Sequence, residues 1–303
     1  MKIGINTDCS CGSTCKETLQ NVKAAGFENI MLAERSGDLE TNLCLAREMG
    51  LGVSSVHLSY NDVNDLWKSG QSNRDFVKNF IRRLEILGKY NVKVADIHAS
   101  YVKNRKEQET PSAEQAIATM KEILEVACKL GINIAVENLN LYLTVFTQIL
   151  LDNINSPNLG LCYDAGHKNL WTPTKDLLAT YGSRCFTIHL HDNFMDDQTG
   201  STAELDHHML PFDGKIDFAK EMRDLATVGY DGVIMLEVNR YDWVNNVPRP
   251  IYEKLSIVDF LKLAKTRAEK LAENLFKNKF IIGAGLLCTI LTNLKSRISR
   301  LAL

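Results

Sequence analysis

Short apolar runs and longer amphipathic segments alternate along the chain up to about residue 261. The apolar runs are nearly continuous, which is typical of parallel strands that are buried on both faces. They occupy residues 2–6, 29–34, 52–58, 93–99, 132–138, 159–165, 184–190 and 231–238. Eight such runs separated by helical patterns predict an α/β fold, a single (β/α)8 TIM barrel.

The segments between the runs carry apolar residues at helical spacing. Residues 112–129 show this most clearly, with Ala116, Ile117, Met120, Ile123, Leu124 and Ala127. Ser112 stands at the expected start of that helix. Glycines follow several of the helical patterns, at the position where a helix commonly ends; they are Gly26, Gly50, Gly131 and Gly229.

We expect the barrel to occupy residues 1–265 and a helical extension to occupy residues 266–303. The longest interruption, residues 191–216, follows the seventh run, and a loop of that length in a compact domain is usually functional. Residues 262–303 hold nine Lys/Arg and two Asp/Glu, a formal charge of +7. The whole chain carries −2, which leaves −9 for residues 1–261.

The extension contains an apolar run at 280–294, with basic residues on both sides. As a helix, these 15 residues span about 22 Å, less than the roughly 30 Å of a bilayer core. We expect this helix to pack on the barrel or on another subunit of a homo-oligomer. Contact with a membrane interface is the alternative, and a spanning helix is not expected.

Composition narrows the class of protein further. The chain of 303 residues is 45% hydrophobic and 24% charged, which is ordinary for a globular protein. A net charge of −2 gives no support to a nucleic-acid surface, which usually carries a basic excess. The eight cysteines have no framework-like spacing and the first residues resemble a strand, not a secretory signal, so we expect a cytoplasmic protein.

Histidines and acids gather at the ends of the predicted strands. In a barrel, the carboxyl ends of the strands and the loops after them meet at one mouth. The residues so placed are His57, His98, Glu137, Asp164, His167, His189, His191, Asp192, Asp206, His207, His208 and Glu237. Three acids embedded in apolar strands repel one another unless a cation separates them. The pattern therefore predicts a divalent metal site.

Four motifs resemble a known family. AVEN at 135–138, LCYDAGH at 161–167, IHLHDN at 188–193 and MLEV at 235–238 resemble the xylose isomerase-like barrels of the sugar phosphate isomerase/epimerase superfamily, which also includes endonuclease IV. The loop sequence from Asp206 to Pro211 resembles the D-x-H-x-x-P pattern of the isomerase/epimerase branch. This chain departs from that branch at Phe212, where a glycine is expected, and it has Met195 where ketose 3-epimerases have an arginine.

The resemblance implies an enzyme that acts on a sugar, a sugar phosphate or a related polyol or keto compound. It implies one divalent ion (Mn, Zn, Mg or Co) held by Glu137, Asp164, His189 and Glu237. Glu137 and Glu237 would also move the proton, through a metal-bound enediolate. The residues expected to contact the substrate are His167, His57, His98, Asp206, His208 and Arg240. Other basic residues that could meet a phosphate are Lys103, Arg105, Lys168 and Lys215.

The endonuclease branch is the alternative. It is a tri-zinc phosphodiesterase that acts on abasic DNA, and the resemblance maps its nine ligands onto His57, His98, Glu137, Asp164, His167, His189, Asp206, His208 and Glu237. The residues after Glu137 and Glu237 are unlike those of the nuclease. The charge of −9 over residues 1–261 is also unfavourable for binding a polyanion.

Overall fold

A computed structural model describes residues 1–101, 112–194, 205–242 and 247–301, with the side chains of the last helix described as far as Gly285. Eight parallel strands form its central sheet in the order β7-β6-β5-β4-β3-β2-β1-β8. They are β1 Ile3–Asn6, β2 Asn29–Ala33, β3 Gly52–His57, β4 Val94–Ile97, β5 Asn133–Glu137, β6 Leu159–Asp164, β7 Cys185–His189 and β8 Ile234–Leu236. A parallel bridge between Leu190 and Leu236 joins the two ends of the sheet, so the predicted barrel is confirmed.

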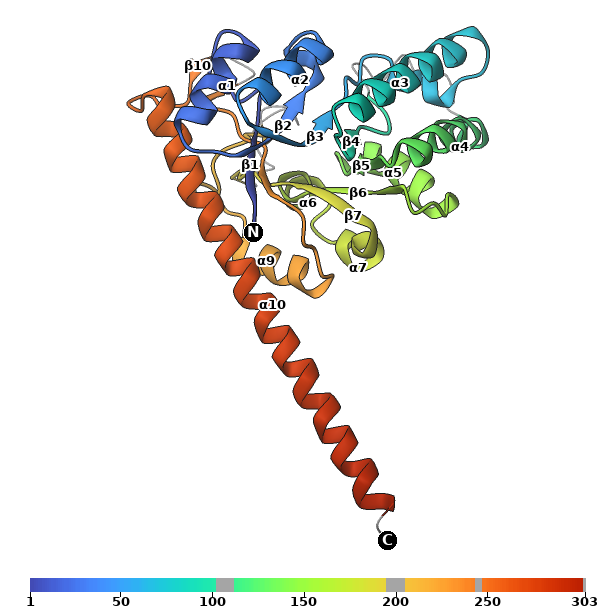
Figure 1. The fold of residues 1–303 in the computed structure, drawn as a ribbon, viewed down its shortest axis with the longest axis vertical. Helices are drawn as coiled ribbons and strands as arrows, with labels where there is room; N and C mark the ends of the chain where they lie inside the picture. The colour runs from blue at the N-terminus through green and yellow to red at the C-terminus, as the bar shows by residue number, and fades with distance from the viewer. Residues whose placement is uncertain (102–111, 195–204, 243–246, 302–303) are drawn as a thin grey trace.

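Helices surround the sheet (Figure 1). They are α1 Cys15–Ala24, α2 Leu39–Glu48, α3 Gln71–Lys89, α4 Ala113–Leu130, α5 Leu141–Asn153, α6 Ala165–Trp171, α7 Leu177–Tyr181, α9 Phe218–Thr227 and α10 Ile257–Leu301. Short 3-10 helices lie at Glu34–Ser36, Val63–Trp67 and Gly182–Arg184, and a small antiparallel pair joins β9 Tyr241–Asp242 to β10 Val247–Pro248.

Helix α4 shows how the sequence signals act. The Ser112 side chain caps its first turn by accepting a hydrogen bond from the Gln115 amide at 3.2 Å. The helix ends at Gly131, which adopts the left-handed conformation with φ 65°. The predicted apolar stripe is largely buried against the barrel, and its fully buried members are Ala116, Met120, Ile123 and Ala127.

Helix α10 differs from the expectation for the extension. It begins at Ile257, so the boundary expected at residues 265 and 266 falls inside one continuous helix. Its first half packs against α9, α1, β1 and β8, and the last fully buried side chain is Leu275. The helix then runs away from the barrel (Figure 1), and Phe280 and Ile281 are 72% and 66% exposed. The expected packing of this run on the barrel is therefore wrong for the residues with described side chains.

The reason is the straightness of an uninterrupted helix. Neither a proline nor a turn bends α10 after Leu275, so its axis leaves the curved surface of the barrel. Among the helices whose residues are described, none is both long enough and apolar enough to cross a membrane.

Asp192 organises the loop that follows β7. Its buried carboxylate accepts hydrogen bonds from four backbone amides, those of Asn193, Phe212, Gly214 and Ile216, at 2.8–3.1 Å. Phe212, which stands where a glycine was expected, has φ 76° and so keeps the left-handed backbone that a glycine would favour. The loop therefore keeps this backbone conformation despite the departure in sequence.

Substitution of Gly214 by alanine is expected to disrupt this loop. A Cβ atom at Gly214 would overlap the Asn193 carbonyl and the Asp192 carboxylate. We expect Gly214→Ala to lower the free energy of unfolding by about 1–3 kcal/mol, measured by chemical denaturation. The control is Gly283→Ala on the exposed part of α10, where nothing lies within 4 Å and stability should not fall. Equal stability of the two variants would contradict this account.

Candidate metal centre

Four strand ends bring the predicted metal ligands together. Glu137 ends β5, Asp164 ends β6, His189 ends β7 and Glu237 follows β8. Each residue offers one ligand atom, and the four atoms all lie within 4.8 Å of one another. The four residues are buried, with at most 6% of any of them exposed.

Three of these ligand atoms are polar and buried without a hydrogen-bond partner among the described residues. They are His189 Nδ1, Asp164 Oδ2 and Glu237 Oε2. His189 Nδ1 lies only 3.1 Å from Glu237 Oε2 and 3.8 Å from Asp164 Oδ2. Because nearly all buried polar atoms in proteins have a partner, three converging atoms without one call for an explanation. One imidazole and three carboxylates are a donor set that fits a divalent metal ion.

A second layer of side chains fixes the orientation of His189. Its Nε2 atom lies 3.3 Å from Asp96 Oδ2 and 3.4 Å from the Cys162 thiol, so Nδ1 faces the carboxylates. The same Asp96 oxygen accepts a hydrogen bond from the Ser55 hydroxyl at 2.9 Å. Asp96 is not among the residues predicted from the sequence, although an acid inside the apolar strand β4 is a visible signal. Partners of this kind commonly orient metal-binding histidines.

His57 and His98 flank Glu137 from the neighbouring strands. Their Nε2 atoms lie 3.2 and 3.3 Å from Glu137 Oε2, and the three residues form a further group that could hold a metal ion. The Tyr60 ring stacks on His98, with 4.5 Å between ring centroids and 3° between planes. The structure therefore places both predicted histidines at the same mouth as the four carboxylate and imidazole ligands.

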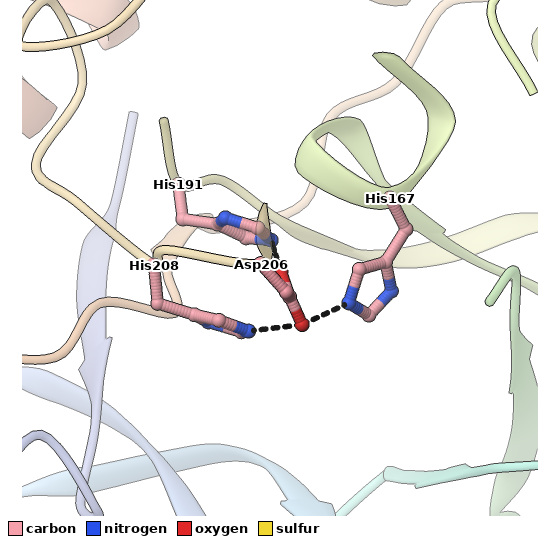
Figure 2. Close-up of side chains that lie close together, drawn as sticks. All are labelled: His167, His191, Asp206 and His208. Carbon is pink, nitrogen blue, oxygen red and sulfur yellow. Dashed lines mark hydrogen bonds and ion pairs between the residues drawn. The ribbon is translucent and has the colours of Figure 1, made fainter. Parts of the chain in front are cut away.

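A further group combines His167 from α6 with three residues that follow β7 (Figure 2). Asp206 Oδ2 lies between two imidazoles, 3.3 Å from His167 Nε2 and 3.2 Å from His208 Nε2. The His191 ring stacks on His208 at 3.9 Å, and its Nε2 atom lies 3.1 Å from Asp164 Oδ1. His191 was noted in the sequence but given no role. Asp164 thus contacts His191 through Oδ1, while its Oδ2 lies between His167 Nδ1 at 3.6 Å and His189 Nδ1 at 3.8 Å.

A pocket of about 350 Å3 opens above these groups. Its lining residues are Asn6, Asp8, Arg35, His57, Tyr60, His98, Glu137, His167, Asp206, His208, Glu237, Val238 and Asn239. Asp164 and His189 are absent from the lining and fully buried, so they lie beneath its floor. The sequence analysis missed Asp8, Arg35 and Tyr60, because they belong to the ends of the first three strand–loop units and carry no motif of their own.

The described lysine and arginine residues that were predicted to contact the substrate or its phosphate do not line the pocket. The Arg240 guanidinium donates to the Leu255 carbonyl at 2.8 Å and does not line the pocket. Lys168 is buried beside Glu221 at 3.3 Å, and Lys215 is exposed. Lys103, Arg105 and Met195 lie outside the described residues.

The charges of the carboxylates and imidazoles in the site balance one another. Burial opposes ionisation of Glu137, but the charges of His189 and His98 outweigh it and hold the Glu137 pKa well below its usual value. Burial also disfavours the charged form of His57, yet its hydrogen bond to Glu137 and the nearby Asp96 raise the His57 pKa to about 9. The burial cost of His208 is likewise outweighed by Asp206, and the His208 pKa is about 9. The carboxylates therefore create a strongly negative potential, which a metal cation would neutralise as the protonated imidazoles do.

The fold and the site together define a (β/α)8 barrel with a carboxylate- and histidine-rich centre at the carboxyl ends of its strands. The family model for the xylose isomerase-like TIM barrel matches residues 19–264, and the chain belongs to this family. The protein y4fM of Sinorhizobium fredii is 27% identical to it in an alignment 252 residues long that covers 71% of this chain and 78% of that protein.

Solved structures show the same fold. D-psicose 3-epimerase from Clostridium cellulolyticum, solved with D-tagatose, is 17% identical with a TM-score of 0.70, covering 89% of this chain and 99% of that one. The IolI protein, solved with a bound zinc atom, is 18% identical with a TM-score of 0.68, covering 92% of this chain and 99% of that one. The suspected family is therefore confirmed.

The role of Asp96 can be tested by metal affinity. We expect Asp96→Asn to weaken zinc binding about 10- to 100-fold, measured by competition with a chromophoric chelator, because the amide no longer holds His189 as the carboxylate does. Asp152→Asn is the matched control, since Asp152 only accepts a hydrogen bond from Tyr181 away from the site. Unchanged affinity in Asp96→Asn would remove this residue from the metal centre.

Proposed function

We propose that this protein is a divalent-metal-dependent isomerase or epimerase of a small sugar or a related polyol or keto compound. One observation carries the proposal: Glu137 and Glu237 both line the pocket and both belong to the group of four candidate ligands. Each of these carboxylates could therefore contact a metal ion and a substrate carbon at once. The sugar-processing neighbours of the same fold support this choice.

A divalent metal bound by Glu137, Asp164, His189 and Glu237 would polarise a substrate carbonyl and acidify the adjacent C–H bond. One of the two pocket glutamates then removes the proton from that carbon. The other glutamate returns a proton to the opposite face, which gives epimerisation, or a proton moves to the neighbouring carbon, which gives isomerisation. The pKa of both glutamates is lowered, so both are ionised at neutral pH.

The remaining polar groups are suited to holding hydroxyl groups of the substrate. His167, His57 and His98 surround Glu137, and Asp206 and His208 stand on the side of Glu237. Imidazoles can donate hydrogen bonds to hydroxyl groups or accept them, and ionised carboxylates accept them, so this lining could bind a polyhydroxylated molecule. A pocket of about 350 Å3 is within the range of small-molecule sites.

The charge of the lining favours an uncharged sugar over its phosphate. Four carboxylates face the pocket, those of Asp8, Glu137, Asp206 and Glu237. Among the described lining residues, Arg35 is the basic residue other than histidine, and it pairs with Asp8. A phosphate would therefore meet more negative than positive groups unless metal ions compensate for them.

A tri-zinc phosphodiesterase is the second candidate function. The observation that favours it is the pair of additional groups, His57–His98–Glu137 and His167–His191–Asp206–His208, beside the main one. Together the three groups contain all nine residues that the resemblance to endonuclease IV singled out. The excess of carboxylates in the pocket lining and the charge of −9 over residues 1–261 remain unfavourable for DNA.

The proton-transfer roles can be tested by isotope exchange. In deuterated water with Mn2+ and a panel of ketoses, aldoses and inositol derivatives, the wild-type protein should incorporate deuterium beside the carbonyl of its substrate. We expect Glu137→Gln and Glu237→Gln each to slow incorporation by at least about 100-fold, measured by mass spectrometry. Glu122→Gln, on the exposed face of α4, is the control and should exchange normally. Full exchange in either pocket variant would remove that residue as a base.

Metal content separates the two candidate functions. The isomerase proposal predicts one tightly held ion per chain by elemental analysis and no cleavage of a duplex that contains an abasic site. Three zinc ions per chain, together with cleavage that a chelator abolishes, would overturn it in favour of the phosphodiesterase.

A further inference from the structure

The outer half of α10, residues 276–301, leaves the barrel surface as a single helix (Figure 1). Up to Leu275 the helix buries an apolar stripe against the barrel, and in the stretch beyond it with described side chains, 276–285, the large apolar side chains are exposed. Phe276, Phe280, Ile281 and Ile282 are all exposed, from 41% to 72%. Single exposed apolar residues are common, but four within seven residues of a projecting helix mark an interaction surface.

The sequence of this outer half has two further properties. It is apolar over residues 280–294, and the chain contains no aspartate or glutamate after Glu273. Lys277 and Lys279 precede the apolar run, and Lys295, Arg297 and Arg300 follow it. The basic residues therefore lie at both ends of the run. Glu273 lies 3.8 Å from Lys277, but both side chains are about two-thirds exposed and the pair is weak.

The charge pattern decides between the occupants that could cover this surface. If two copies of the helix paired, in parallel or antiparallel, basic residues would face basic residues at both ends, with no acidic residue to compensate. An anionic lipid surface instead suits both the apolar run and the basic residues at its ends, because it offers an apolar layer for the run and negative headgroups for the flanking cations. We infer that the outer half of α10 binds the surface of an anionic membrane.

Length indicates how the helix lies in that surface. The apolar run spans about 22 Å, less than the roughly 30 Å of a bilayer core, so the helix lies in the interface and does not cross it.

The full chain should therefore co-sediment with vesicles of phosphatidylglycerol and phosphatidylcholine in equal parts, and not with phosphatidylcholine alone. Binding should weaken as salt is raised. We expect Lys277→Glu with Lys279→Glu to weaken binding at least about tenfold, and Phe280→Asp with Ile281→Asp to abolish it. Ile251→Asp, an exposed isoleucine outside α10, is the matched control and should bind as the wild type does.

Thermal unfolding of the variants separates a folding defect from a binding defect, and all of them should melt as the wild type does, because the substituted side chains are exposed or, for Lys279, half-buried at the helix surface. Two outcomes would overturn the inference. One is equal binding to neutral and anionic vesicles. The other is absence of vesicle binding by a chain that is dimeric in light scattering and becomes monomeric in Phe280→Asp with Ile281→Asp, which would assign the surface to a second copy. Neither outcome bears on the proposed function, since the inference rests on α10 alone.

Discussion

The concentration of buried carboxylates at one end of the barrel is the constraint on which the candidate site depends. Glu137, Asp164 and Glu237 place ligand atoms within 4.8 Å of one another and of His189, and all four residues are nearly excluded from solvent. Like charges in such a position destabilise the folded chain unless positive charge is supplied. In the metal-free protein the imidazoles supply it. A divalent cation would do so with the donor atoms already in place, which is why the metal centre is the natural account of this arrangement.

The barrel confines these charged groups to the strand ends and so keeps them out of its apolar core. Each ligand stands where a strand stops, and two residues before Glu137, Asp164 and Glu237, on the same face of the strand, lie the buried residues Ala135, Cys162 and Met235. Asp164 has both a structural role and a place in the candidate site. One of its oxygens caps α6 by accepting a hydrogen bond from the His167 amide, while the other faces His189. The helix that carries His167 thus begins on a candidate metal ligand.

The eight strands and the three acids Glu137, Asp164 and Glu237 could be predicted from local signals, which are continuous apolar runs and acids embedded within them. The resemblance to a known family added His189 and implied that the four residues act as one set of ligands. Other parts of the site leave no such signal or, in the case of Asp96, a signal that does not reveal the role of the residue. Asp8, Arg35 and Tyr60 reach the pocket through loop conformation, and Asp96 acquires its importance only because β4 brings it beneath His189, 93 residues away in the chain. The course of α10 could not be predicted either, because an apolar run can cover the same chain, another chain or a lipid surface, and the direction of the helix axis distinguishes these cases.

The central claim is that Glu137, Asp164, His189 and Glu237 hold a divalent metal ion. Anomalous diffraction at the zinc edge, from crystals of the protein equilibrated with zinc, tests it most directly. The account predicts a strong peak with Glu137, Asp164 and Glu237 oxygens and His189 Nδ1 at about 2.0–2.2 Å. A peak only among His167, His191, Asp206 and His208, or none within reach of His189, would contradict it.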